Sequence, residues 1–321
     1  MALENDRLEP LPAQASALAA GLRFPEGPVA MADGSVLLVE IARGTLTRIA
    51  ADGTKAEVAR LGGGPNGLAI GPDGRAYVCN NGGFDWIEDR GVLRPAPTVA
   101  DATYDGGRIE RVDLKSGAVE VLYTGSEAGP LNGPNDIVFD SAGGFWFTDL
   151  GKYRERTIDR GAVYYAKADG SAIERVIFPM VTPNGIGLSP DGKRLYVAES
   201  QTARLWAFEV TAPGRIRKQD WPSPNGGALV VGLPGYQIFD SLAVEADGRI
   251  CIGTLISGGI TIVSPGRSKT EFVKLPDPLP TNICFGGKGL ETAFITLSGS
   301  GRLIALPWPR PGLAPNYSGL G

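Results

Sequence analysis

The chain of 321 residues contains no histidine. Without an imidazole, the protein cannot run Ser-His-Asp or Cys-His nucleophilic catalysis, and it cannot build a histidine-based zinc site. Any acid–base chemistry is therefore left to carboxylates, lysine, tyrosine or metal-bound water.

Cysteines and blocks of like charge are scarce. Three cysteines, Cys79, Cys251 and Cys284, stand far apart in apolar stretches, which favours reduced core residues over a disulfide framework or a zinc site. Lys and Arg total 31 against 35 Asp and Glu, a net charge of −4, and no basic block stands out. These features predict no nucleic-acid partner.

Long apolar runs are also missing, because no stretch approaches the roughly 20 residues of a membrane span. Residues 1–10 carry three acidic side chains, where a signal peptide would be basic. We therefore expect a cytoplasmic protein with no membrane partner, either a monomer or a homodimer.

Glycine and proline are abundant, with 46 and 25 residues, and a hydrophobic content of 43% is enough for a core. Within this turn-rich chain, a polar residue that could bind a cation recurs six times. The residues are Glu26, Asn66, Asn135, Asn184, Asp240 and Asn282. Their spacings of 40, 69, 49, 56 and 42 residues are typical of a four-stranded unit that repeats with loop insertions.

Each repeat predicts a β-hairpin. Asp-Gly follows the polar residue at offsets seven and eight in four repeats, Ala142-Gly143 replaces it in a fifth, and Gly289-Leu290 is a degenerate sixth. Alternating apolar residues flank these turns, as in two strands joined by a tight turn. We predict an all-β protein, a six-bladed β-propeller with four-stranded antiparallel blades around a central channel.

The whole chain, residues 1–321, is predicted to form one propeller domain. The sixth repeat lacks a fourth strand, and residues 14–22 could supply it and so close the ring. The longest insertion, residues 82–106, mixes aromatic with charged residues. A loop of this length in a compact domain is usually functional, so we expect a lid or a pocket wall, with a surface excursion as the alternative.

Polar residues at the same place on six inner strands would converge on the axis, where carboxylate and amide oxygens suit a hard cation. Asn in Pro-Asn-Gly also suits a turn without any metal. A turn does not explain Glu26 and Asp240, since two carboxylates aimed at one axis repel unless a cation or a proton compensates them. A second polar set, expected to orient the first or to contact substrate, stands fourteen or fifteen residues later: Glu40, Asn80, Asp149, Glu199, Thr254 and Thr296.

Five motifs in register resemble the SMP-30/gluconolactonase/luciferin-regenerating-enzyme family. They are Pro25-Glu26-Gly27-Pro28, Leu131-Asn132-Gly133-Pro134-Asn135-Asp136, Phe145-Trp146-Phe147-Thr148-Asp149, Pro183-Asn184-Gly185 and Thr281-Asn282-Ile283-Cys284-Phe285-Gly286-Gly287. The resemblance implies a six-bladed propeller with one axial divalent cation, calcium above all, with zinc, manganese, magnesium or iron as alternatives.

The resemblance also implies a lactonase and assigns roles to residues. Glu26, Asn184 and Asp240 would bind the metal, with Asn135 as a fourth ligand or a substrate contact. The metal would act as a Lewis acid, while Asp240 would be the base that activates water; Asp136 and Asp149 are the next candidates for that base. The predicted substrate contacts are Asn66, Asn135, Asp149 and Asn282.

One position departs from the family pattern. Gluconolactonase-like members tend to carry an arginine before the Leu-Asn of the third motif, whereas this chain has Pro130. A lactone or ester less polar than a sugar lactone is therefore an equal candidate, with pocket residues drawn from Phe84, Trp86, Trp146, Tyr153 and Tyr236.

Two alternative functions remain open at this point. A phosphotriesterase or arylesterase could use the same axial metal, since both reactions polarise an oxygen at the ion. A non-catalytic propeller could instead present a protein-binding face and hold a purely structural cation.

Overall fold

A computed structural model describes residues 12–266 and 269–320. The acidic segment of residues 1–10 lies outside this range. The described residues are nearly all strands and turns, with a single 3₁₀ turn, η1, at Lys288–Leu290. No helix among them is long and apolar enough to cross a membrane. All three cysteines are free thiols, as predicted.

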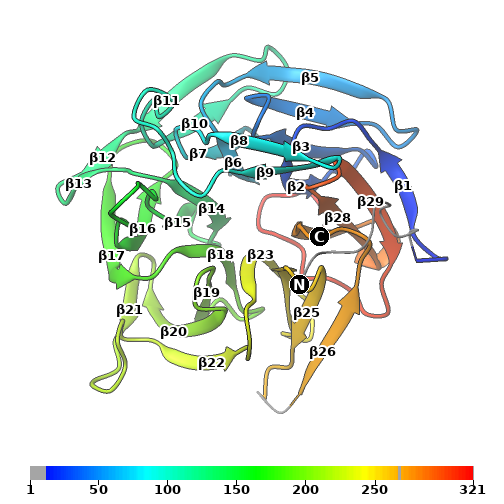
Figure 1. The fold of residues 1–321 in the computed structure, drawn as a ribbon. Coiled ribbons are helices and arrows are strands. Elements are labelled where there is room, and N and C mark those ends of the chain that lie inside the picture. Colours follow the sequence, from blue (N-terminus) through cyan, green and yellow to red (C-terminus); the bar gives the residue numbers. More distant parts are fainter. Residues whose placement is uncertain (1–11, 267–268, 321) are drawn as a thin grey trace.

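Six antiparallel sheets form a ring (Figure 1). From the axis outward, the first three blades are β2 (Pro25–Ala30), β3 (Val36–Glu40), β4 (Thr45–Ile49) and β5 (Lys55–Arg60); β6 (Pro65–Ile70), β7 (Ala76–Asn80), β10 (Arg108–Val112) and β11 (Val119–Tyr123); and β14 (Pro134–Phe139), β15 (Gly144–Asp149), β16 (Gly161–Lys167) and β17 (Ile173–Met180).

The other three blades follow the same order. They are β18 (Pro183–Leu188), β19 (Arg194–Glu199) and β20 (Arg204–Ala212) with β21 (Arg215–Arg217) and β22 (Ala228–Gly232); β23 (Ile238–Val244), β24 (Ile250–Leu255), β25 (Gly259–Val263) and β26 (Thr270–Lys274); and β27 (Pro280–Gly286), β28 (Thr292–Leu297), β29 (Arg302–Pro307) and β1 (Ser16–Ala19). This arrangement confirms the predicted six-bladed propeller.

The two ends of the chain meet in blade six. Strand β1 pairs antiparallel with β29, with Ser16 opposite Ala305 and Ala17 opposite Ile304. The pairing lies within residues 14–22, the segment expected to close the ring, and it covers the edge that β29 would otherwise expose.

Every inner strand is irregular at the residue that faces the axis. The register with the second strand shifts around Glu26, Asn66, Asn135, Asn184, Asp240 and Asn282. A bulge bends its strand locally and redirects the side chain beside it. The repeat therefore encodes a bulge as well as a polar residue. We call the face of the ring at which these six strands begin the top face.

Close packing of the inner strands explains the glycines that follow three axial residues, Gly27, Gly67 and Gly185, as the first two show. Gly27 has a φ of 54°, and a Cβ there would lie 2.6 Å from the carbonyl oxygen of Asn66. A Cβ on Gly67 would lie 2.4 Å from the carbonyl oxygen of Asn135. Neither contact is tolerable, so a larger residue would push neighbouring blades apart at the axis.

The insertion of residues 82–106 joins β7 to β10 on the top face and contains a hairpin, β8 (Trp86–Asp89) and β9 (Val92–Pro95). In Figure 1 the hairpin lies over β2 and β3. The Trp86 ring packs 5.1 Å from Phe24 before blade one, and Leu93 donates its N–H to Gly299 O of blade six at 2.8 Å. The insertion therefore extends over neighbouring blades.

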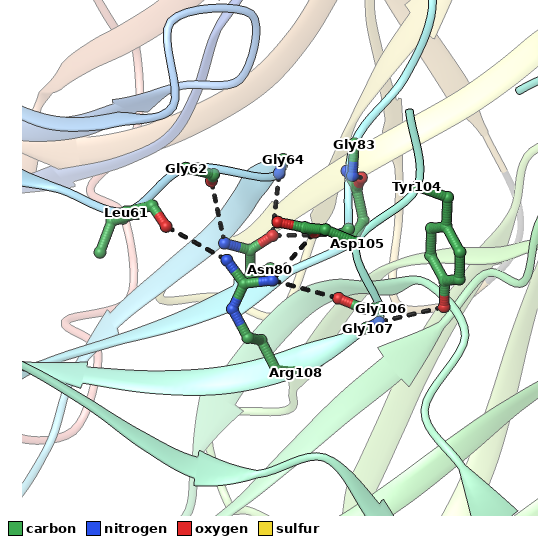
Figure 2. Close-up of polar contacts among 12 residues, drawn as sticks. Leu61, Gly62, Gly64, Asn80, Gly83, Tyr104, Asp105, Gly106, Gly107 and Arg108 are labelled. Atoms are coloured by element: carbon green, nitrogen blue, oxygen red, sulfur yellow. Dashed lines mark hydrogen bonds and ion pairs between the residues drawn. The ribbon is translucent and has the colours of Figure 1, made fainter. Parts of the chain in front are cut away.

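The two ends of the insertion are tied together by Asn80 and Arg108 (Figure 2). Asn80 Oδ1 accepts the N–H groups of Gly64 and Gly82 at 2.8 and 3.1 Å. Arg108 Nη1 donates to Asp105 Oδ1 at 3.0 Å, and its Nη2 donates to Leu61 O at 3.1 Å. These bonds fix where the insertion leaves and rejoins blade two.

Lys152 attaches the insertion to blade three. Its side chain is fully buried, and Nζ donates to Asn81 Oδ1 at 3.1 Å and to Gly83 O at 2.7 Å. The same Nζ lies 4.2 Å from the centre of the Phe84 ring. Burial lowers the pKa of Lys152 to about 7, although the charge of Asp149 opposes that shift.

Replacement of Lys152 by methionine tests this attachment. The folded chain releases the lysine proton near pH 7, and the unfolded chain holds it to about pH 10.5. Burial of the ammonium therefore weakens the fold below pH 7, and this penalty declines as the pH rises towards 10.5. The unfolding free energy of wild type relative to Lys152→Met should rise over this range, by at most about 1.4 kcal/mol per pH unit.

Urea denaturation across this pH range measures the difference. The exposed Lys115 provides the control, since Lys115→Met should give a difference that does not change with pH. A pH-independent difference for Lys152→Met would show that the ammonium is not buried in solution.

Candidate functional site

Glu26 is held by hydrogen bonds at one of its two carboxylate oxygens. Its side chain is buried, and Oε2 accepts the Gly27 N–H at 2.6 Å and the Asn282 Nδ2–H at 2.7 Å. Its other oxygen, Oε1, is buried without a hydrogen-bond partner. Burial raises the pKa of Glu26, while the bonds from Asn282 and Gly27 act to lower it.

Two further carboxyl groups share this environment. Desolvation, followed by the negative charge of Glu26, raises the pKa of Asp240 well above its usual range. The same two causes raise the pKa of the buried Asp136 to about 8. Asp136 Oδ1 accepts the Ile137 N–H at 2.9 Å, and Oδ2 accepts the Ile186 N–H at 3.2 Å. The three carboxyl groups near the axis thus disfavour one another's ionisation.

Asn184 is oriented by two serines. Its Nδ2 donates to Ser200 Oγ at 3.1 Å, and its Oδ1 accepts from Ser241 Oγ at 3.4 Å. Ser241 directly follows Asp240, so the amide oxygen of Asn184 faces the strand that carries this carboxylate. Neither serine was predicted; each stands one residue beyond a predicted polar position, Glu199 and Asp240.

The residues fit a hard divalent cation. Glu26 Oε1 and Asn135 Oδ1 are both buried acceptors without a partner, and a buried unpartnered acceptor is costly. The donor set is carboxylate and amide oxygen throughout, which is what calcium and magnesium prefer. Across residues 12–266 and 269–320, no three acidic or cysteine side chains form a cluster able to hold a metal, so the fit depends on Asn184 and Asn135.

The other two axial amides differ from each other. Asn282 uses both ends of its side chain: Nδ2 holds Glu26, and Oδ1 accepts the Ile283 N–H at 2.7 Å. It therefore positions a carboxylate in this structure. Asn66 is buried at the equivalent place on β6.

The second polar set holds backbone in place. Glu40, Asn80, Asp149 and Glu199 accept N–H groups from the loop that leads into the inner strand of their own blade, from Arg23, Gly64, Asn132 and Val181 respectively. Asp149 also binds the Gly133 N–H at 2.7 Å, so both of its oxygens are engaged. These four of the six residues thus fix the loops that precede the axial residues of their blades.

The aromatic residues expected in a pocket lie in different environments, some in the core and one exposed on the surface. Trp146 is fully buried against Val163 and Trp206 between blades three and four, so it is core and that expectation was wrong. Phe84 and Trp86 pack on the core of the first two blades. Tyr236 is exposed on the top face. Pro130 lies in a short hairpin, β12 (Gly125–Ser126) with β13 (Gly129–Pro130).

The far half of the axis is apolar. A cavity of about 140 Å³ lies there, lined by Ile70, Phe139, Leu188, Val244, Phe285 and Leu313 among others. The C-terminal segment crosses this end: Leu313 donates its N–H to Val244 O, and Asn316 Nδ2 donates to Phe139 O, each at 2.9 Å. A polar substrate would therefore approach the axial residues from the top face.

Comparisons with known proteins agree with this geometry. The chain is 26% identical over 266 residues to a lactonase, drp35, of Staphylococcus haemolyticus, covering 79% of this chain and 73% of that protein. It is 26% identical to a gluconolactonase of Zymomonas mobilis, covering 73% of this chain but only 61% of the relative.

Solved structures show the same fold. A gluconolactonase of Xanthomonas campestris superposes with a TM-score of 0.72 at 21% identity, covering 95% of this chain and 92% of that one. A regucalcin of Agrobacterium tumefaciens, described as a calcium-binding protein, gives 0.69 at 18% identity, covering 91% and 92%. The sequence model of the SMP-30/Gluconolactonase/LRE-like region matches residues 24–299, which include all six axial positions. The chain therefore belongs to the SMP-30/gluconolactonase/LRE-like family.

Proposed function

We propose that the protein is a divalent-metal-dependent lactonase. The observation that carries this proposal is the pair of buried, unpartnered oxygens, Glu26 Oε1 and Asn135 Oδ1, beside the high-pKa carboxyl of Asp240. The lactonase and gluconolactonase relatives support the reaction class. The substrate is a small lactone or ester.

Glu26, Asn135, Asn184 and Asp240 would hold the cation. When bound, a divalent cation at these oxygens supplies Lewis-acid polarisation of the substrate carbonyl. Asn282 keeps Glu26 in place, and Ser200 with Ser241 keeps the amide oxygen of Asn184 turned towards the site. Calcium is the first candidate because every donor is oxygen.

Asp240 is the proposed general base. It is partly open in a ring whose other acids are buried, so it can contact water from the top face. It would take the proton from the attacking water, and the same proton would pass to the leaving alkoxide when the ring opens. Asp136 and Asp149 are weaker candidates, because backbone N–H groups bind both oxygens of each carboxyl group.

Removal of the Glu26 charge should weaken cation binding. In Glu26→Gln the side chain keeps its size but loses the anionic oxygen that lacks a partner, so we expect the dissociation constant for calcium to rise at least tenfold. Titration calorimetry on chelator-treated protein measures this constant. The exposed Glu155→Gln should bind as the wild type does. A metal-free protein with full activity would contradict metal dependence.

Replacement of Asp240 separates base from ligand. Asp240→Asn keeps an oxygen of similar size but cannot accept the proton, so turnover at saturating metal should fall by ~10²–10⁴-fold. Glu26→Gln should instead recover much of its turnover when the metal is in excess. The exposed Asp220→Asn is the control. If Asp240→Asn recovers as fully as Glu26→Gln does, Asp240 is only a ligand and Asp136 becomes the candidate base.

A further inference from the structure

The top face has two unlike halves, and the insertion defines the first. Its contacts lead to blade one through Trp86 and Phe24, to blade six through Leu93 and Gly299, and to blade three, where Val99 donates its N–H to Tyr153 O at 3.0 Å. These contacts place the insertion over blades six, one, two and three. None of these contacts involves blades four and five, and we call the top face over those two blades the open half.

The open half carries exposed apolar side chains. Ile158, Val181, Tyr236 and Ile256 have exposed fractions of 58, 41, 69 and 47%. Val181, Tyr236 and Ile256 lie in top-face loops of blades four and five, and Ile158 lies in the loop between β15 and β16 of the adjoining blade three. We call these four residues the apolar rim. The loops that carry them are linked: Tyr153 pairs with Ile158, and the Ser257 N–H donates to Gln237 Oε1 at 3.3 Å. Exposed apolar side chains gathered beside a binding site commonly mark what the site binds.

The rim is continuous with the axial site along the chain. Val181 precedes Asn184 by three residues, and Tyr236 precedes Asp240 by four. Ile256 directly follows β24, whose last residue, Leu255, pairs with Ile238 at the start of the strand that carries Asp240. The same strand ends thus carry both the proposed cation ligands and the rim.

Tyr153 connects the rim to blade three. Burial raises the pKa of its phenol, hydrogen bonding with Thr182 and Gln201 of blade four acts to lower it, and the phenol of Tyr236 on blade five raises it further. Tyr153 therefore lies between the loops that present Val181 and Tyr236. It also accepts the Val99 N–H, so it stands where the insertion ends and the open half begins.

Two rim loops hold strained backbone. Ile256 has a φ of 74° and Thr182, next to Val181, has a φ of 47°. A β-branched residue at positive φ is a genuine outlier, and such strain persists where the surrounding structure over-determines it. Ile256 thus keeps a strained backbone conformation although its exposed side chain gains little stabilisation from packing.

We propose that the apolar rim binds an alkyl or aryl substituent of the substrate, so that the preferred substrates are apolar lactones or esters rather than polyhydroxylated sugar lactones. This inference rests on the proposed lactonase function. The axial oxygens would serve the carbonyl end of the molecule, and the rim would remove its hydrocarbon end from water. A buried methylene contributes about fourfold in affinity, whereas a sugar hydroxyl placed there would lose its hydration.

A series of γ-lactones with an alkyl chain of increasing length tests the proposal at saturating metal. For the wild type, kcat/KM should rise about threefold to fourfold per methylene until the rim is covered, and gluconolactone should be the poorer substrate. Tyr236→Ser and Ile256→Asn should flatten this dependence and leave the shortest lactone nearly unaffected. Asparagine suits Ile256 because it tolerates positive φ.

Leu229 supplies the matched control. It lies on outer strand β22 of blade four with an exposed fraction of 45%, close to that of Ile256, and Leu229→Asn should keep the wild-type dependence on chain length. A wild type without chain-length dependence, or rim variants that retain it in full, would overturn the proposal. So would rim variants altered only in self-association or vesicle binding, which would assign the rim to a macromolecular partner.

Binding separates this inference from the lactonase proposal. The corresponding γ-lactams cannot be hydrolysed readily, and their affinity by calorimetry should rise with chain length in the wild type and stay flat in Tyr236→Ser. If no lactone is turned over but lactam affinity still rises with chain length, the lactonase proposal is wrong and the proposed role of the apolar rim stands. Turnover without chain dependence in either assay would do the reverse.

Discussion

Electrostatic repulsion among acids on one axis is the constraint around which this ring is organised. Glu26, Asp136 and Asp240 come from three blades, and each has a raised pKa because the interior desolvates it; the charge of Glu26 adds to the shift for Asp136 and Asp240. Hydrogen bonds from Asn282 and Gly27 hold Glu26, and the Ser241 N–H holds Asp240, without neutralising either carboxyl group. A bound cation would relieve the repulsion that folding alone leaves uncompensated.

The six repeats share one backbone arrangement around the axis, but their side chains and loops differ. A bulge turns one side chain to the axis, and in four blades the end of the second strand accepts N–H groups of the loop before that bulge. On this common frame the side chains differ from blade to blade, and the insertion covers some blades and leaves others open. The repeat thus fixes where each axial side chain lies, and the insertion makes the top face asymmetric.

The fold and the axial residues could be predicted because both depend on local signals that recur: a polar residue, an alternating strand and a turn. Asp136 received less weight because the equivalent position is glycine in three repeats, Gly27, Gly67 and Gly185, so no period marked it. Lys152 was missed, since its partners Asn81 and Gly83 are about 70 residues away and no periodicity links them. Trp146 was misplaced because both faces of a blade pack on neighbouring blades: Phe145 and Phe147 lie in the core between blades two and three, and Trp146 lies in the core between blades three and four.

Closure of the ring by β1 and β29 has a consequence for the order of assembly during synthesis. Residues 16–19 are synthesised before the other strands that the structure describes, yet their partner β29 ends at Pro307, so blade six stays incomplete until residue 307 has been made. Until blade six folds, Glu26 lacks its hydrogen bond from Asn282, and blades one and five each have one sheet face with no neighbouring blade packed against it. A nascent chain of this kind has exposed sheet surface that can associate wrongly, so demand for chaperones should be greatest just before the last blade appears.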